Sequence, residues 1–283
     1  MPWWRFRCTL RVAVCACLAA ALLVSVLLCR FRAPFPPAWS LAGFLDDNGG
    51  GPMRRGGPTL YVVTPTYRRA TQAPDLVRLS QALLLAQARI FWVIVEDADQ
   101  PSALVRGIMR RTGLPGVQLV VRTPAEYRLH HKGRGVTQRM KALAWLRAKA
   151  TLPGVVYFAD DDNAYDHSIF SQMARVQAVG VFPVGLISAF GISSPVVSPE
   201  GRVVGFHDAY LPTRRRFPVD MAGFAVNLQL VLAADDLRMP HKQGMLESDF
   251  LTSLGVDRDE LEPLASNCTE TGNTASSLQR YME

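Results

Sequence analysis

A short apolar run that ends in three consecutive aspartates constrains the fold of this chain more than any other feature. Residues 155–162 read VVYFADDD. A run of this kind is typical of a strand that is buried on both faces, as in a parallel sheet covered by helices. The carboxylates follow where this strand should end, and open α/β sheets bind their ligands at the carboxyl ends of the strands. The run therefore predicts an α/β fold with a binding site at that edge of the sheet.

The chemistry of this site depends on what offsets the aspartates, since three adjacent carboxylates repel one another. A divalent cation such as Mg²⁺ or Mn²⁺ prefers oxygen ligands of this type. The alternative is a solvated acidic turn that caps a helix beginning near His167, because aspartate is common in turns and helix caps.

The positive charge of the chain is concentrated at its N-terminal end. The formal net charge is +7, and residues 1–55 contain seven arginines and two aspartates, which leaves only +2 for the other 228 residues. A basic surface spread over the folded part is the usual mark of a nucleic-acid-binding protein. We therefore expect no nucleic-acid partner.

The N-terminal segment also contains a long uncharged stretch. Residues 12–29 lack any charged side chain, and this length is the minimum for a membrane-spanning helix. The flanking arginines and the free N-terminus favour a cytoplasmic N-terminus. A cleaved signal peptide is the alternative, but its apolar core would be long and no clear cleavage site precedes Arg30. We expect a cytoplasmic tail at 1–11, a transmembrane signal anchor at 12–29 and a flexible stem rich in Pro and Gly at 30–58.

From residue 59 onward, apolar runs alternate with amphipathic ones. This alternation is typical of βαβ units and a mainly parallel sheet. We expect strands at 60–64, 91–95, 117–121 and 155–159, and helices at 75–86, 102–111 and 136–150. In the second half we expect strands at 181–187, 202–207 and 222–232, with short helical pieces at 168–177 and 247–254. Together they form a mixed sheet within one domain over residues 59–270.

Two further strand ends carry residues that suit ligand binding. Tyr67 follows the first strand and offers a ring on which a nucleobase can stack, although taken alone this stretch is better explained as a plain strand-ending turn. Asp97 follows the second strand and can accept a hydrogen bond from a nucleobase or ribose, although a helix cap is the alternative. Because parallel strands end at one edge, both positions fall near the aspartate run.

A basic segment lies before the expected helix at 136–150. Residues 128–141 contain five Lys or Arg, two His and no acid. Arg134 and Arg139 lie around the start of this helix, where guanidinium groups and the helix dipole both favour phosphate. A solvated basic face is the alternative. An acidic edge beside a basic loop favours a metal–diphosphate ligand.

Three single positions complete the set of candidates. Glu247 begins a short helix, where an acid stabilises the helix dipole, yet it could also act as a general base in a cleft. Asp220 is an acid among apolar neighbours. Asn267 fits the N-glycosylation pattern Asn-Cys-Thr. Four of the five cysteines lie in or beside the uncharged stretch, so we expect neither a disulfide scaffold nor a zinc site.

Several sequence blocks together resemble the β-1,3-glucuronosyltransferases, glycosyltransferase family 43. The blocks follow one another in the same order over residues 59–270. They are VVTPTYRR (62–69), DLVRLSQALLL (75–85), WVIVEDA (92–98), RGVTQR (134–139), VVYFADDDNAY (155–165), FPVGL (182–186), GRVVGFH (201–207), RFPVDMAGFAV (216–226), LESDFL (246–251) and LEPLASNCT (261–269).

The resemblance implies a GT-A-type nucleotide-sugar transferase fold, with a Rossmann-like mixed sheet and flanking helices, preceded by one transmembrane helix. It implies an inverting, Mn²⁺-dependent transfer of glucuronic acid from UDP-glucuronate to the 3-hydroxyl of a terminal galactose on a protein-linked glycan, in proteoglycan linker synthesis. It also implies a single-pass type II protein of the Golgi membrane with a lumenal catalytic domain. We further expect a homodimer, with glycosylation at Asn267.

The resemblance also implies roles for individual residues. Glu247 is implied as the catalytic base and Asp162 as the metal ligand. The implied donor-binding residues are Tyr67 and Asp97 for uridine, Arg134 and Arg139 for the charged groups, and Asp160, Asp161 and Asp162 in the acidic motif. Arg215 and Asp220 are implied at the acceptor.

The chain departs from the family pattern at three places. Members of the family continue after Asn-Cys-Thr with a Val-Trp-His-Thr-Arg-type segment that reaches the donor diphosphate, whereas residues 270–277 here read ETGNTASS. We expect a polar tail at 271–283 without strand structure. Met140 replaces an Asn, and Ser193 falls near an acceptor-binding Glu.

The departures leave a second class of function open beside the enzyme. It is a catalytically impaired relative that serves as a galactoside-binding or partner subunit. A metal-dependent phosphohydrolase is disfavoured, because none of the five histidines has ligand spacing.

Overall fold

The computed structural model describes residues 57–128, 134–187, 190–207, 214–242, 244–271 and 273–274. The expected cytoplasmic tail and transmembrane anchor, and the stem up to residue 56, lie outside these ranges. No helix in the described ranges is long and apolar enough to cross a membrane. The described residues all belong to one compact unit.

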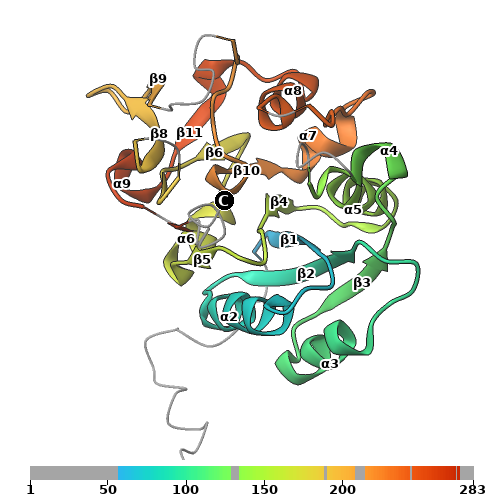
Figure 1. Cartoon of the computed structure of the whole chain (residues 1–283). Helices are drawn as coiled ribbons and strands as arrows, with labels where there is room; N and C mark the ends of the chain where they lie inside the picture. Colours follow the sequence, from blue (N-terminus) through green and yellow to red (C-terminus); the bar gives the residue numbers. More distant parts are fainter. Residues whose placement is uncertain are drawn as a thin grey trace, which may run out of the picture. The chain divides into compact units, whose positions relative to one another are not determined.

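A mixed sheet of seven strands forms the centre of this unit, in the order β11-β6-β10-β4-β1-β2-β3 (Figure 1). The strands β1, β2, β3 and β4 run parallel, whereas β10 is antiparallel to both of its neighbours. Their bounds are Thr59–Thr66 (β1), Arg89–Glu96 (β2), Gly116–Val120 (β3), Gly154–Phe158 (β4), Val179–Val181 (β6), Phe224–Asn227 (β10) and Leu261–Pro263 (β11). The predicted parallel α/β first half is confirmed.

Helices cover both faces of this sheet. Figure 1 shows α2 and α3 on one side of the strands and α5, α7 and α8 on the other. The helices are α2 (Gln72–Leu85), α3 (Ala103–Thr112), α4 (Ala125–Arg128), α5 (Val136–Lys149), α6 (His167–Met173), α7 (Leu228–Ala233), α8 (Leu246–Ser253) and α9 (Ala265–Cys268). Sequence analysis did not predict the single turn α4.

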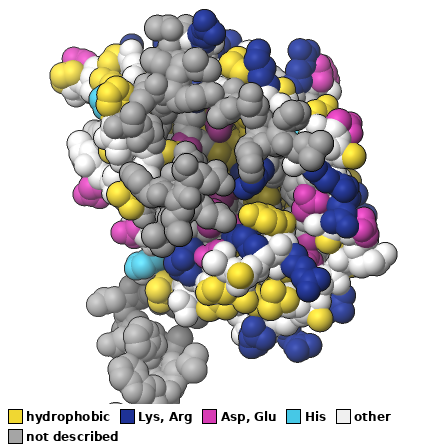
Figure 2. All heavy atoms as spheres, viewed as in Figure 1, with side chains coloured by type: hydrophobic (Ala, Val, Ile, Leu, Met, Phe, Trp, Pro, Cys, Tyr) yellow, Lys and Arg dark blue, Asp and Glu magenta, His cyan; other side chains and the backbone are white. Residues whose placement is uncertain are grey.

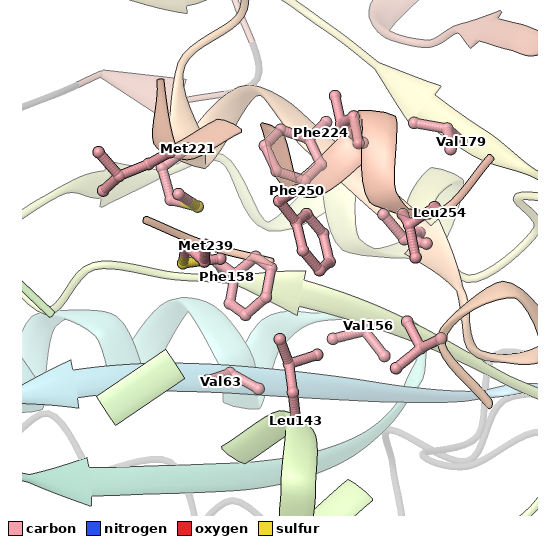
Figure 3. Close-up of a cluster of buried hydrophobic side chains, with 14 of the residues drawn as sticks. Val63, Leu143, Val156, Phe158, Val179, Met221, Phe224, Met239, Phe250 and Leu254 are labelled. Atoms are coloured by element: carbon pink, nitrogen blue, oxygen red, sulfur yellow. The ribbon is translucent and has the colours of Figure 1, made fainter. Parts of the chain in front are cut away.

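Successive residues of the central strands pack into two different cores, because side chains alternate across a sheet. In β4, Val156 and Phe158 belong to the core beneath α5 and α8, whereas Val155 and Tyr157 belong to the core beneath α2 and α6. Burial on both faces explains why the strand has no polar alternation. Figure 3 shows Phe158 facing Phe250 of α8, and their ring centroids are 5.5 Å apart.

A second sheet has the order β5-β12-β7-β8-β9. Its strands are β5 (Ala164–Tyr165), β7 (Val184–Gly185), β8 (Ile192–Val197), β9 (Val203–His207) and β12 (Asn273–Thr274). The expectation of a tail at 271–283 without strand structure was wrong at 273–274, where the backbone pairs with both β5 and β7. Residues 273–274 are a strand because their backbone pairs with β5 and β7, and the polar side chains of the segment give no sign of this pairing.

Two of the predicted strands in the second half were wrong in extent. The run at 222–232 is a short 3₁₀ turn, Met221–Gly223, followed by β10 and then by α7. The chain changes from strand to helix at Asn227, whose side-chain oxygen accepts a hydrogen bond from the backbone N–H of Gln229 at 2.9 Å. The run at 181–187 is interrupted at Pro183, which has no N–H to donate to a ladder.

Candidate active site

One cavity of about 310 Å³ lies where β1, β2 and β4 end. All seven residues that the sequence assigned to donor binding line it: Tyr67, Asp97, Arg134, Arg139, Asp160, Asp161 and Asp162. They come from four separate segments of the chain, and the parallel strand ends bring these segments together. Figure 2 shows acidic and basic side chains interspersed over the visible face of the molecule.

The middle aspartate of the run is held by the protein itself. The two terminal guanidinium nitrogens of Arg69, Nη1 and Nη2, each lie 2.8 Å from an oxygen of Asp161, and the hydroxyl of Thr66 donates to the same carboxylate at 2.6 Å. Burial raises the pKa of Asp161, although the hydrogen bonds from Arg69 and Thr66 oppose that shift. Burial would lower the pKa of Arg69, but its bonds to Asp161 and Asp75 raise it instead. Asp161 therefore lines the cavity as a group anchored by Arg69 and Thr66.

The first aspartate of the run is paired across the cavity. Arg139, which is only 4% exposed, binds the carboxylate of Asp160 through Nη2 and the carbonyl oxygen of Arg134 through Nη1, at 3.1 Å. Its buried Nε has no hydrogen-bond acceptor among the described residues. A buried guanidinium with a spare donor suits an anionic ligand.

The third aspartate, Asp162, is partly buried and lies near two other negative charges. Burial, followed by the charges of Asp160 and Asp161, raises the pKa of Asp162 to about 6. In the described part of the chain, no three acidic, His or Cys side chains are arranged to hold a metal ion by themselves. Mg²⁺ and Mn²⁺ prefer oxygen ligands and often bind through one or two carboxylates, with water and substrate phosphates completing the shell. The carboxylate of Asp162, which lines the cavity, has the donor chemistry for such a cation.

The alternative of a solvated acidic cap was wrong. Helix α6 begins at His167, and its cap is Asp166, whose carboxylate accepts a hydrogen bond from the backbone N–H of Ser168 at 2.8 Å. The three aspartates before it are not needed for the cap, and Asp161 is only 5% exposed.

Asp97 is held by residues that sequence analysis did not single out. Its carboxylate accepts hydrogen bonds from the hydroxyl of Thr123 at 2.6 Å and from the backbone N–H of the same residue at 3.0 Å. The amide of Gln138 donates to the hydroxyl of Thr123 at 3.2 Å. Thr123 and Gln138 both line the cavity. Helix α3 is capped by Ser102 instead, so the helix-cap alternative for Asp97 was also wrong.

Aromatic rings lie at two positions of the cavity wall. Tyr67 is exposed, and the guanidinium of Arg69 lies 4.9 Å from the centre of its ring. Tyr127 of α4 stacks on His241 with ring centroids 3.8 Å apart, and His241 forms a hydrogen bond with Thr137 of α5 at 3.1 Å. Tyr127 was missed because nothing in its neighbourhood predicted the turn of α4.

Glu247 does not line the cavity but lies in a charged group that adjoins it. It occupies the first turn of α8. Burial, followed by the charge of Asp220, raises the pKa of Glu247 to about 7, while Arg215 and Arg139 oppose the shift. Arg139 therefore connects the two groups, since it also binds Asp160. A carboxyl with this pKa can accept a proton near neutral pH.

The two residues expected at the acceptor lie in this second group. Arg215 is buried and donates from Nη1 to the carbonyl oxygen of Val219 at 3.3 Å. The carboxylate of Asp220 accepts a hydrogen bond from the backbone N–H of Ala222 at 3.0 Å. The hydroxyl of Ser248 in α8 accepts one from the N–H of Phe217 at 3.2 Å, which ties this loop to the helix of Glu247.

The remaining positions from the sequence lie elsewhere. Asn267 is exposed, in a turn whose residues 265–268 all have positive φ. Cys268 is a free thiol. Met140 packs against the core beneath α5, and Ser193 is buried in β8.

Comparison with known proteins identifies the family. The sequence model of Glycosyltransferase family 43 matches residues 79–272. Galactosylgalactosylxylosylprotein 3-beta-glucuronosyltransferase 3 of Mus musculus is 46% identical over 233 residues, which cover 75% of this chain and 68% of the relative. The Homo sapiens protein of that name is 47% identical over 234 residues, with the same coverage. Galactosylgalactosylxylosylprotein 3-beta-glucuronosyltransferase S of Drosophila melanogaster is 42% identical over 214 residues, covering 75% of this chain and 52% of the relative.

Solved structures give a weaker likeness. Residues 1–349 of S. aureus TarS align with 15% identity and a TM-score of 0.47, covering 79% of this chain and 62% of that chain. That overlap is too low to assign a fold. The family model and the curated relatives are sufficient by themselves, and the chain belongs to glycosyltransferase family 43.

Proposed function

We propose that the chain transfers glucuronic acid from UDP-glucuronate to the 3-hydroxyl of a terminal galactose, on a GT-A-type fold and with Mn²⁺. The family, and the activity for which its relatives are named, support a glucuronosyltransferase. The observation that carries the proposal is the junction at Arg139. This residue binds Asp160 in the cavity and also lies in the charge field of Glu247. Arg139 therefore links the candidate donor site to the candidate base.

The cavity offers complementary groups for each part of the donor. The ring of Tyr67 can stack on uracil, and Asp97 is held in place to accept a hydrogen bond from the base or ribose. Arg134 and Arg139 supply positive charge for the diphosphate, and Asp160 and Asp161 supply acceptors for sugar hydroxyls. A divalent cation held by Asp162 would neutralise charge on the departing UDP.

The chemistry is a single displacement at the anomeric carbon. The galactose O3 attacks that carbon from the side opposite the diphosphate, and the bond to the phosphate oxygen breaks, so that UDP leaves with the electron pair. Glu247 accepts the proton of the attacking hydroxyl. Arg215 and Asp220 lie close enough to Glu247 to influence its charge, and we assign them to the acceptor. One base is sufficient, because no covalent enzyme intermediate forms.

The pH dependence of transfer should follow the carboxyl of Glu247. Burial and the charge of Asp220 raise its pKa from 4.5 to about 7, and a general base acts only in its ionised form. We expect kcat to fall as the pH drops through about 7 and to level off above this value. The measurement is kcat at saturating donor and acceptor on both sides of neutrality. A rate that stays flat down to the ordinary pKa of glutamate would contradict this assignment.

The cellular location that we propose rests on the uncharged N-terminal stretch of the sequence. The uncharged stretch at 12–29 supports a type II anchor, which would place residues 59–270 in the Golgi lumen. Exposure of Asn267 supports N-glycosylation there. We also retain the homodimer as part of the proposal.

One assay tests the function directly. The chain is incubated with UDP-glucuronate, Mn²⁺ and either a galactosyl-galactose or an N-acetyllactosamine acceptor, and the glucuronidated product is measured. We expect product with galactosyl-galactose, the acceptor named in the relatives. Binding of UDP-glucuronate without transfer to either acceptor would favour the impaired partner subunit. Absence of donor binding would refute the proposed function.

A further inference from the structure

Helix α2 contacts the loop that carries the three aspartates through Arg78, a side chain that does not line the cavity. We infer that Arg78, with Asp75 and Arg69, is a positioning residue that fixes the backbone of Asp162 and thereby sets the affinity for the divalent cation. This inference rests on the proposed function, because it concerns the cation of that same site. It assigns a role to a helix face that neither the cavity nor the reaction uses directly.

Arg78 contacts the loop at the residue expected to hold the cation. Its Nη2 donates to the carbonyl oxygen of Asp162 at 2.8 Å, and its Nε donates to the carbonyl oxygen of Asn163 at 3.3 Å. Two consecutive carbonyls bound by one planar guanidinium leave the intervening peptide little freedom to rotate. The orientation of the Asp162 side chain follows from the peptide that carries it.

Asp75 orients the arginine that makes these contacts. One of its oxygens lies 3.2 Å from Nη2 of Arg78, and the other lies 2.8 Å from Nη2 of Arg69. Arg69 in turn holds both oxygens of Asp161. The side chains of Arg69, Asp75 and Asp161 are 11%, 11% and 8% exposed. Asp75 of α2 therefore contacts both arginines that bind this loop, Arg69 at Asp161 and Arg78 at Asp162.

The helix does not need these contacts to stay in place. Its apolar face buries Leu76, Leu79 and Leu83 completely or almost completely against the sheet. The side chain of Arg78 is instead 42% exposed, so shortening it creates no cavity in the core. This separation of roles makes a variant of Arg78 informative about the loop.

The test compares Mn²⁺ binding by the full chain and by its variants in the presence of UDP. Binding is measured from the electron paramagnetic resonance signal of the Mn²⁺ that remains free. Groups that orient a metal ligand typically change metal affinity by 10–100-fold, so Arg78→Gln is expected to weaken Mn²⁺ binding about tenfold. Arg78→Lys keeps the charge but lacks the fork, and we expect a loss of about threefold. In transfer assays the KM for Mn²⁺ should rise in parallel, while kcat at saturating Mn²⁺ stays near that of the wild type.

Arg106→Gln is the matched control, because Arg106 is an exposed arginine on the neighbouring helix α3; it should bind Mn²⁺ like the wild type. Melting temperatures show whether each variant folds, and if Arg78→Gln does not fold, Arg78→Lys decides the question. Wild-type affinity in the folded variant overturns the positioning role but leaves the proposed function intact. A wild-type chain that binds no Mn²⁺ with UDP refutes the proposed function, and this inference with it.

Discussion

Replacing Glu247 with glutamine is expected to reduce glucuronosyl transfer by about 10²–10⁴-fold, the usual contribution of a general base. Glutamine keeps the shape of the side chain but cannot accept the proton of the attacking hydroxyl. The loss should appear in kcat, with little change in the binding of UDP, because Glu247 does not line the donor cavity. The measurement is steady-state transfer together with a direct titration of UDP.

The same substitution is expected to stabilise the folded chain. The pKa of Glu247 is raised from 4.5 to about 7 by burial and by Asp220. A raised pKa means that stability is complete at low pH and is lost as the pH rises through about 7. Above that pH, Glu247→Gln removes the partly buried charge and should increase the free energy of unfolding by on the order of 2 kcal/mol. The measurement is the unfolding midpoint of both proteins below and above neutral pH.

A control on the same helix separates catalysis from folding. Asp249 lies two residues further along α8, on the opposite side of the helix. Asp249→Asn makes the same chemical change and should retain the wild-type rate. Transfer that survives in Glu247→Gln, or that is lost equally in Asp249→Asn, would remove Glu247 from its assigned role.

The first half of the fold could be predicted because its strands are buried on both faces. Residues 155–158 and 91–95 are short apolar runs, and each proved to be a central parallel strand. The same signal failed at 222–232, where the buried strand β10 and the mostly apolar helix α7 follow one another and therefore read as one run. Only the cap at Asn227 separates them. Short apolar runs do not distinguish strand from helix, and a single capping side chain decides.

The parts of the site that could be predicted are those tied to strand ends. Tyr67, Asp97 and Asp160 each follow a parallel strand, so the topology alone brings them to one edge. The clamp formed by Arg69 and Arg78 could not be found in this way. Its contacts join residues 84 to 92 positions apart, and arginines on a helix surface are common. Such pairings follow from how α2 packs, which no local pattern records.

The second large effect is expected at Asp162, the proposed cation ligand. Asp162→Asn replaces an ionised oxygen by an amide and leaves the cation without its protein carboxylate. We expect Mn²⁺-dependent donor binding to weaken by about 10–100-fold. Transfer should be almost abolished, since losing one group that stabilises developing charge typically costs about 10²–10³ in rate. The fold should be largely unaffected, because asparagine keeps the size of the side chain and Asp161 keeps its bonds to Arg69 and Thr66.

The measurement is the rise in melting temperature on adding Mn²⁺ and UDP together, since a ligand that binds only the folded state stabilises it. The wild type should show this rise, and Asp162→Asn should lose the part that requires Mn²⁺. The control is Asp166→Asn four residues further on, where asparagine can still cap α6. If the Mn²⁺-dependent rise persisted in Asp162→Asn, the cation would have to bind elsewhere. The three aspartates would then only line the cavity, with Asp161 bound by Arg69 and Asp160 bound by Arg139.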